Sequence, residues 1–361
     1  SLGIYAFYLM VRRYFGDRTG LFAGLIFLSS VWFMFSRKIM PDTFSASLVL
    51  LGLFFLTSYL ENGKWHSILL FFLLGSLGGL SKIPAMIILS LSMIAVISRT
   101  ITLNKRILTL CALVAAGLII VAWYFIWEPW LLNKYQNQLY FPRGIIQGIN
   151  DLWAQWGWTL DKFTFVSLHS YVSLFFFILG IYFMIKRRNS LLMLILGISL
   201  PLLVCFMIKS GYVFVTHDYY IIPFVPVMAL IAGYGLASVN WLKTARVFLV
   251  IIMIEGVANQ VHDFRLNRSE LYLLNLEKIA DMVCLRSDRI AITGGLNPEE
   301  MYYVHRKGWG LAPKDLTNTA YLNELQKQGC RLLFVNKKEF NTVLNFPVVY
   351  NDQHYIIYRF E

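Results

Sequence analysis

Long apolar runs separated by short polar loops cover most of the chain up to about residue 260. A helix needs about 20 mainly apolar residues to cross the roughly 30 Å hydrocarbon core of a bilayer. By that measure the pattern predicts about nine to ten membrane-spanning helices, of which 66–80 and 83–98 are short. The predicted spans are 2–11, 20–36, 43–60, 66–80, 83–98, 107–127, 169–185, 191–208, 220–239 and 246–261.

The pattern changes after these spans. "ELYLLNLEKIADMVCL" and "NTAYLNELQKQGC" have helical spacing, and "NPEEMYYVHRK" begins like a helix. "DRIAITG", "RLLFVNK" and "VVYNDQHYIIYRF" predict strands, the last of them a hairpin around Asn351 and Asp352. The sequence therefore predicts a polytopic α-helical membrane protein over 1–261 and a small C-terminal α/β domain over 262–361.

The charges of the loops predict the orientation. Alternate loops ("VRRYFGDR", "ENGK", "SRTITLNKR", "KRRNS" and "KTAR") hold twelve Lys or Arg residues and two acids, whereas the other loops hold seven and five. Cytoplasmic loops carry the excess of Lys and Arg. We therefore expect the second set of loops and the C-terminal domain to face the outside of the plasma (inner) membrane.

The segment 128–168 is too polar to span a membrane and is rich in Trp and Tyr, which favour the membrane–water interface. We expect one or two helices that lie along the outer surface there.

Composition agrees with a membrane protein. Hydrophobic residues make up 58% of the 361 residues and the mean hydropathy is +0.60, so a bilayer has to accommodate much of the apolar surface. The net charge of +12 is explained by the loop asymmetry and indicates no nucleic-acid partner. The four Cys form no CxxC pair. For Cys284 and Cys330, a disulfide and two free thiols both stay open.

Charged side chains at the outer ends of spans are candidate functional residues, because charge near a bilayer is costly. Asp42 follows Pro41 at a helix start, where it is either a simple helix cap or an ionised carboxylate with a chemical role; the two readings are compatible. Lys82 lies between Gly79 and Pro84, as an interfacial anchor or as a phosphate ligand.

"VTHDYYIIPFVP" is the third candidate. His217 and Asp218 can exchange protons or bind an ion, although they supply fewer than the three or four ligands of a usual metal site. The alternative is a belt of interfacial aromatic residues with a polar cap. Arg37, Lys38 and Arg143 add positive charge on the same predicted face.

The order of these parts resembles the GT-C membrane glycosyltransferases, in particular the protein O-mannosyltransferase and aminoarabinose-transferase group (glycosyltransferase family 39-like). The resemblance covers roughly 1–260 and rests on three segments, followed by a soluble outer domain. The segments are "RRYFGDRTGLFAGLIFLSSVWFMFSRKIMPDTFSASLVL", "GSLGGLSKIPAMIIL" and "HDYYIIPFVPVMALIAGYGL".

The resemblance implies an inverting hexosyl or pentosyl transferase. In such enzymes a polyprenyl phosphate carries the donor sugar, and the acceptor, a lipid, glycan or protein, comes from outside. Asp42 would be the catalytic carboxylate and Lys82 would hold the lipid phosphate. The other predicted substrate-binding residues are Arg37, Lys38, Arg143, His217, Asp218, Tyr219 and Tyr220. No cofactor is implied firmly, and a divalent metal stays open.

One departure from the family affects Asp42. The family's first outer loop, which carries the acid usually taken as the base, has no counterpart in the chain, which opens at Ser1 inside an apolar run. We therefore expect an N-terminally truncated sequence in which Asp42 supports the missing acid.

Two other functions stay open. Broken helices around 75–84 would suit a transporter or flippase of a lipid-linked or anionic substrate, but charge at the outer ends and the lack of an internal repeat favour the transferase. A chain that is truly this short would instead suit a non-catalytic membrane scaffold whose outer tail binds a partner.

Overall fold

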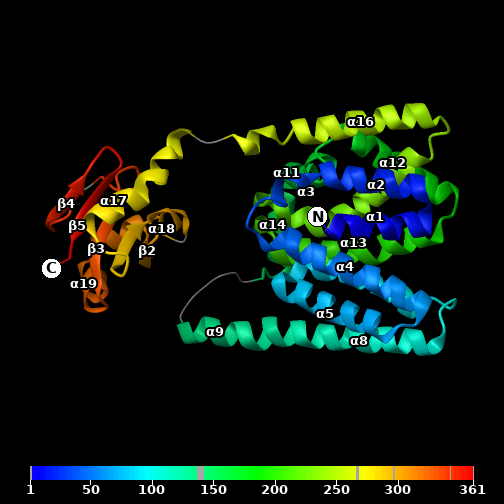
Figure 1. Ribbon diagram of the computed structural model, residues 1–361, viewed down its shortest axis with the longest axis horizontal. Coiled ribbons are helices and arrows are strands. Elements are labelled where there is room, and N and C mark those ends of the chain that lie inside the picture. The colour runs from blue at the N-terminus through cyan, green and yellow to red at the C-terminus, as the bar shows by residue number, and fades with distance from the viewer. Residues whose placement is uncertain (1, 136–141, 266–267, 296, 342, 361) are drawn as a thin grey trace. The chain divides into compact units, whose positions relative to one another are not determined.

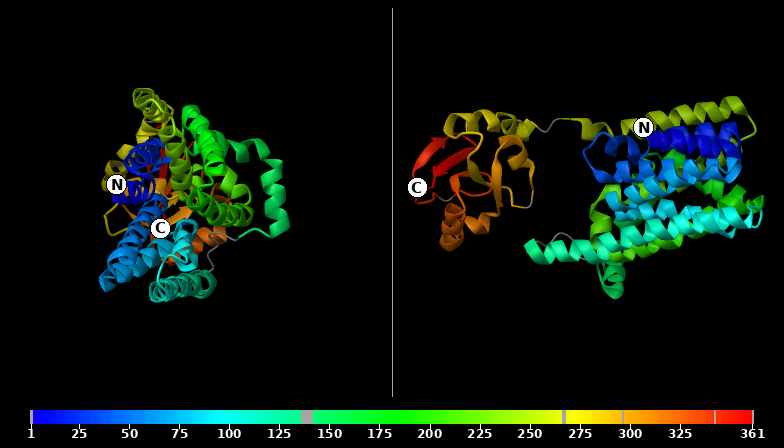
Figure 2. Two further views of the ribbon diagram at one scale, coloured as in Figure 1. Left: turned by 90° about the vertical axis from the view of Figure 1, so that its right-hand side faces the viewer. Right: turned by 60° about the horizontal axis from the view of Figure 1, so that its bottom comes forward.

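The structure, a computed structural model, describes residues 2–135, 142–265, 268–295, 297–341 and 343–360. The chain divides into two compact units, Ser1–Phe264 and Arg265–Glu361. The first unit is a helical bundle whose long helices run side by side (Figures 1 and 2). The second unit is built around a five-stranded sheet.

The membrane unit follows the predicted apolar runs closely. Its helices are α1 (Leu2–Phe15), α2 (Asp17–Ser29), α3 (Val31–Phe35), α4 (Pro41–Asn62), α5 (Trp65–Ser81), α6 (Met86–Leu89), α7 (Met93–Ile97), α8 (Leu103–Ala122), α9 (Glu128–Tyr135), α10 (Ile145–Ala154), α11 (Trp156–Asp161), α12 (Tyr171–Lys186), α13 (Ser190–Ser210), α14 (Tyr212–Thr216), α15 (Val225–Ala237) and α16 (Leu242–Ala258).

The polytopic helical class is confirmed, but fewer helices are long enough to span a membrane than predicted. Among the described residues, four helices are long and apolar enough, or up to six if each of two bent helix pairs is counted as one span. The prediction was nine to ten. The count falls because several apolar runs form helices shorter than 18 residues, such as α1, α2 and α5.

The helix that was predicted to end at residue 127 is longer, while the interfacial position of 128–168 stays a prediction. The helix α8 continues through a π-helical turn, Trp123–Trp127, into α9, and the continuous helix ends at Tyr135. Residues 136–141 lie outside the described residues. After them come the short helices α10 and α11, as predicted, and their position at the membrane surface stays a prediction.

The loops with the excess of Lys and Arg lie together at one end of the bundle, which we call the basic end. Side chains from these loops, at about residues 16, 63, 100, 188 and 240, join one another by ion pairs and hydrogen bonds. The pairs are Arg13 with Glu61, Arg18 with the carbonyl of Val239, Lys105 with the carbonyl of Leu60, and Arg187 with Ser238. The Lys- and Arg-rich loops, which predicted the orientation, therefore also lie close together in the structure.

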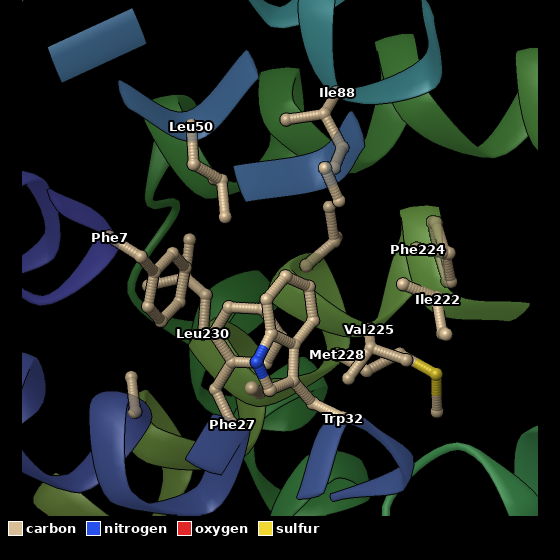
Figure 3. Close-up of a cluster of buried hydrophobic side chains, with 14 of the residues drawn as sticks. Phe7, Phe27, Trp32, Leu50, Ile88, Ile222, Phe224, Val225, Met228 and Leu230 are labelled. Atoms are coloured by element: carbon tan, nitrogen blue, oxygen red, sulfur yellow. The ribbon is translucent and has the colours of Figure 1, made fainter. Parts of the chain in front are cut away.

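An apolar core fills the bundle (Figure 3). Trp32 is 1% exposed, and its ring meets Phe27 edge-on with ring centroids 4.7 Å apart. Side chains from α1, α2, α4, α6 and α15 complete this cluster, which fixes the helices that carry the candidate site at their ends. They include Phe7, Leu50, Ile88, Val225, Met228 and Leu230.

The second unit has helices on both faces of its sheet, whose strand order is β2-β1-β3-β5-β4. The first three strands in that order are parallel, and β5 pairs antiparallel with β3 and β4. Cys284 and Cys330 are free thiols. The elements are α17 (Leu276–Val283), β1 (Arg289–Thr293), α18 (Glu299–Val304), β2 (Lys307–Leu311), α19 (Thr319–Lys327), β3 (Cys330–Asn336), β4 (Val348–Asn351) and β5 (Tyr355–Arg359).

The strands β1, β3, β4 and β5 confirm the predicted strands and the hairpin. The strand β2 was not predicted, because "KGWGL" has two glycines and reads as the end of a helix. Gly308 shows why this strand needs glycine: its φ is +158°, and a Cβ there would lie 1.6 Å from the carbonyl oxygen of Ile290 on β1. Only glycine lets the two backbones approach so closely.

Candidate functional site

Asp42 and Lys82 meet at the end of the bundle opposite the basic end. Asp42 is in the first turn of α4, and Lys82 follows the last residue of α5. The Lys82 Nζ atom lies 2.8 Å from Asp42 Oδ1 and 2.9 Å from Oδ2. The predicted carboxylate and the predicted phosphate ligand are therefore partners in one ion pair.

Close packing of α4 on α5 creates this pair. The Ser45 hydroxyl donates to the carbonyl oxygens of Gly78 at 2.7 Å and of Lys82 at 3.2 Å. A Cβ on Gly78 would lie 2.5 Å from a methyl group of Val49, so a larger residue would force the helices apart. Gly78 therefore serves the close packing of α5 on α4.

The two members of the pair differ in burial. The Asp42 side chain is 3% exposed, whereas the Lys82 side chain is 23% exposed. A carboxylate without its cation at such a position would be strongly destabilising. The pair therefore presents the ammonium group, not the carboxylate, to whatever approaches from outside.

Two tyrosines cover the same ammonium group. Lys82 Nζ lies 4.5 Å from the ring centroid of Tyr219 and 5.2 Å from that of Tyr220, distances typical of cation–π contacts. His217 stacks on Tyr219, with ring centroids 5.0 Å apart. Asp218–Phe224, which contains Pro223, is a 3₁₀ helix ahead of α15, and this tight winding brings the predicted His-Asp-Tyr-Tyr run to Lys82.

Asp218 contacts a cation that the sequence analysis missed. Its Oδ1 atom forms an ion pair with Lys162, which is 3% exposed and begins the π-helical turn Lys162–Val166. Lys162 gave no signal in the sequence, because it stands among other polar residues of the Trp-rich segment. A buried Lys paired across 56 positions of sequence is visible only in three dimensions.

His217 lies near both ion pairs, just ahead of the apolar helix that starts at Asp218. Partial burial lowers the pKa of His217 below its ordinary value, and the charges of Lys162 and Lys82 lower it further, against the opposing effect of Asp218 and Asp42. The imidazole is therefore neutral at pH 7.

Arg37 and Lys38 lie at the margin of this cluster. Both contact Asp263, with Arg37 at 2.5 Å and Lys38 at 2.8 Å from its carboxylate oxygens. Lys38 also lies over the ring of Phe35, which meets Tyr219 edge-on. Lys38 is thus linked to Tyr219 through Phe35, whereas Arg37 lies over the ring of Phe264.

Arg143 contacts a different part of the chain. Its guanidinium group pairs with Asp151 on α10 at 3.3 Å, and its backbone exchanges hydrogen bonds with Lys209 at the end of α13. Among the predicted site residues, the structure thus brings Asp42, Lys82, His217, Tyr219 and Tyr220 together, with Asp218 beside them.

Two cavities among the described residues of this unit bear on the site. An apolar cavity of about 490 Å³ runs beside α4 from Leu50 to Glu61, toward the basic end and away from Asp42. A more polar cavity of about 400 Å³ lies beside Lys162 and Asp218. Within the described ranges, no group of three or more His, Cys, Asp or Glu residues could hold a metal ion.

Residues 1–127 match the family model of the dolichyl-phosphate-mannose-protein mannosyltransferases. This stretch contains both Asp42 and Lys82. No curated protein matches the chain in sequence.

Solved structures resemble the whole chain. Apo ArnT from Cupriavidus metallidurans superposes with a TM-score of 0.59 at 13% identity, over 99% of this chain and 81% of that one. ArnT bound to undecaprenyl phosphate gives 0.55 at 11% identity, over 99% and 82%. An Archaeoglobus fulgidus oligosaccharyltransferase in complex with Zn and sulfate gives 0.50 at 12% identity, over 93% and 55%. The likeness shows an ArnT-like fold, and the resemblance to the GT-C membrane glycosyltransferases is confirmed.

Proposed function

We propose that the protein is a glycosyltransferase that takes a sugar from a polyprenyl-phosphate donor and transfers it to an acceptor at the outer face of the membrane. The observation that carries this proposal is the Asp42–Lys82 pair, which offers a partly exposed ammonium group at one end of a helical bundle with an ArnT-like fold. The ArnT structure with undecaprenyl phosphate supports a lipid phosphate as the ligand class.

In the proposed reaction, an acceptor hydroxyl oxygen attacks the anomeric carbon of the donor sugar. The bond from that carbon to the phosphate oxygen breaks, polyprenyl phosphate leaves as an anion, and the hydroxyl proton passes to a base. Attack opposite the leaving group inverts the anomeric centre. Lys82 stabilises the charge that builds on the phosphate, so the leaving group needs no acid.

We propose that Asp42 acts through Lys82 as a positioning residue. Both of its carboxylate oxygens contact the ammonium group, and it offers almost no exposed surface to a substrate. Asp42→Asn is expected to lower the rate of sugar transfer about tenfold or more, because a charged hydrogen bond to Lys82 is weakened. Donor binding should change little. Transfer at the wild-type rate would contradict this role.

The outer orientation rests on charge. The basic end collects the loops with the excess of Lys and Arg, which favour the cytoplasm, and the Asp42–Lys82 pair lies at the other end. A cysteine-accessibility measurement in sealed membrane vesicles tests it: a cysteine at exposed Ile39 should react with an impermeant reagent from outside, and one at exposed Trp241 should not.

The donor site is tested by binding of undecaprenyl phosphate to the chain in lipid nanodiscs. Lys82→Met should weaken binding about tenfold or more, since a charge-assisted hydrogen bond is lost, and Lys82→Arg should retain part of it. Lys64→Met, at an exposed cation of the basic end, is the matched control and should bind normally. Equal affinities for Lys82→Met and Lys64→Met would refute the proposed donor site.

A further inference from the structure

A polar cavity lies beside the Lys162–Asp218 ion pair. The polar cavity of about 400 Å³ is formed between α11, the turn Lys162–Val166 and the segment around α14. Its volume lies in the range of pockets that hold small ligands. Its lining residues are Gln155, Trp158, Asp161, Lys162, Val166, Tyr212, Val215, Thr216 and Asp218.

The charges of this lining favour a neutral ligand. Two carboxylates, Asp161 and Asp218, face one ammonium group, that of Lys162, which is already paired with Asp218. An anion entering here would meet an excess of negative charge. Carboxylate oxygens with free lone pairs instead accept hydrogen bonds from hydroxyl groups.

Aromatic side chains add a second kind of contact. Trp158 is 66% exposed and Tyr212 is 49% exposed, although both line the cavity. Exposed aromatic faces next to hydroxyl-binding groups suit a ligand with an apolar C–H face and a polar edge, which is the character of a sugar ring.

Lys162 shows that the cavity has a built polar wall. Its side chain is 4% exposed and contributes to the lining, while Asp218 is 46% exposed on the same wall. A buried ammonium group is costly, and a hydrophobic residue could fill the same position at lower cost. Here it holds Asp218, the residue next to His217, in a fixed position at the cavity.

We propose that this cavity is the acceptor subsite and that it binds a neutral, hydroxyl-bearing sugar. The proposal rests on the proposed transferase function, in which the donor phosphate binds at Lys82. Asp218 lines the cavity, and Tyr219, the next residue, covers the Lys82 ammonium group. The acceptor would then be a glycan or a glycolipid headgroup that enters beside Trp158.

Saturation-transfer NMR on the chain in nanodiscs tests the subsite without donor. The probe is a mixture of the methyl glycosides of glucose, galactose, mannose and N-acetylglucosamine, with glucose 6-phosphate as the anionic comparison. At least one neutral glycoside should receive saturation, and the phosphate should receive less. Trp158→Ala and Asp161→Asn should each weaken glycoside binding about tenfold. Trp153→Ala, at a Trp that is 73% exposed outside the cavity, should not.

Three results would overturn the subsite: no glycoside signal on the wild type, an undiminished signal in both cavity variants, or an equal loss in Trp153→Ala. Undecaprenyl phosphate binding is measured on the same proteins. Trp158→Ala and Asp161→Asn should bind this lipid like the wild type, whereas Lys82→Met should not. A wrong acceptor subsite and a wrong donor site therefore give different results.

Discussion

The two ion pairs near His217 have opposite arrangements. In the first pair the Asp42 side chain is 3% exposed and the Lys82 side chain 23%, whereas in the second pair the Lys162 side chain is 4% exposed and the Asp218 side chain 46%. The first pair offers positive charge to a ligand and the second offers negative charge. This difference is what the proposed function uses, with the phosphate at the first pair and the sugar at the second.

The largest expected effect comes from removing the exposed member of the first pair. Lys82→Met leaves Asp42 buried without a cation, which should lower the free energy of unfolding by about 3–5 kcal/mol. Thermal unfolding in detergent micelles measures this change. The double variant Asp42→Asn with Lys82→Met should recover most of the stability but none of the donor binding. Failure to recover would show that the pair does not act as a unit.

In the second pair the acid is the exposed member, so removing Asp218 should destabilise the protein more than removing Lys162. Asp218→Asn leaves Lys162 buried without its carboxylate and should cost about 1–3 kcal/mol, less than the first case because a long Lys side chain can turn toward water. Lys162→Met leaves only a half-exposed carboxylate and should cost less than about 1 kcal/mol. If Lys162→Met lowers the free energy of unfolding more than Asp218→Asn does, Lys162 is not the member of the pair that depends on its partner.

Asp42→Asn is the counterpart of Lys162→Met, since each removes the buried member of its pair. It should also cost less than about 1 kcal/mol, because Lys82 keeps contact with solvent and with the two tyrosine rings. The same unfolding measurement applies. A loss as large as that of Lys82→Met would mean that Asp42 stabilises α4 by itself, as a helix cap.

The smallest expected effect on stability concerns Glu300, a buried carboxyl group whose hydrogen-bond donors are neutral. Glu300, in the second unit, accepts hydrogen bonds from Thr293 at 3.1 Å and from Asn336 at 2.5 Å. Burial raises the pKa of Glu300, and the hydrogen bonds from Asn336 and Thr293 oppose that shift only in part.

A raised carboxyl pKa sets the sign of the pH dependence. The protonated form is favoured by folding, so this contribution to stability is complete below the unfolded pKa and is lost as pH rises through the folded pKa. The protection of strand amides against hydrogen exchange, taken relative to the intrinsic exchange rate at each pH, should therefore fall over that window in the full chain, and Glu300→Gln should remove this fall. An unaltered pH profile in Glu300→Gln would assign the effect to another group.

The sequence predicted elements well where local pattern decides them. The apolar runs, four of the five strands and the hairpin all follow from periodicity and turn residues. It failed at "KGWGL", where glycine is needed because the neighbouring strand passes so close to Gly308. The predicted helix also ended too early, at residue 127 instead of Tyr135. The polar residues after Trp127 do not stop a helix that is already formed.

The candidate site was predictable as single residues but not as partnerships. Asp42, Lys82 and His217 were each named from their place at helix ends. Their pairing depends on Ser45 and Gly78 bringing α4 and α5 together, which no spacing in the sequence reveals. Lys162 was missed for the same reason, since its partner is 56 positions away.

A structure of the chain with bound undecaprenyl phosphate tests the central claim most directly. We expect a phosphate oxygen within about 3 Å of Lys82 Nζ, with Asp42 still in contact with the same ammonium group. A lipid phosphate seated elsewhere, with the Asp42–Lys82 pair closed and untouched, would contradict it.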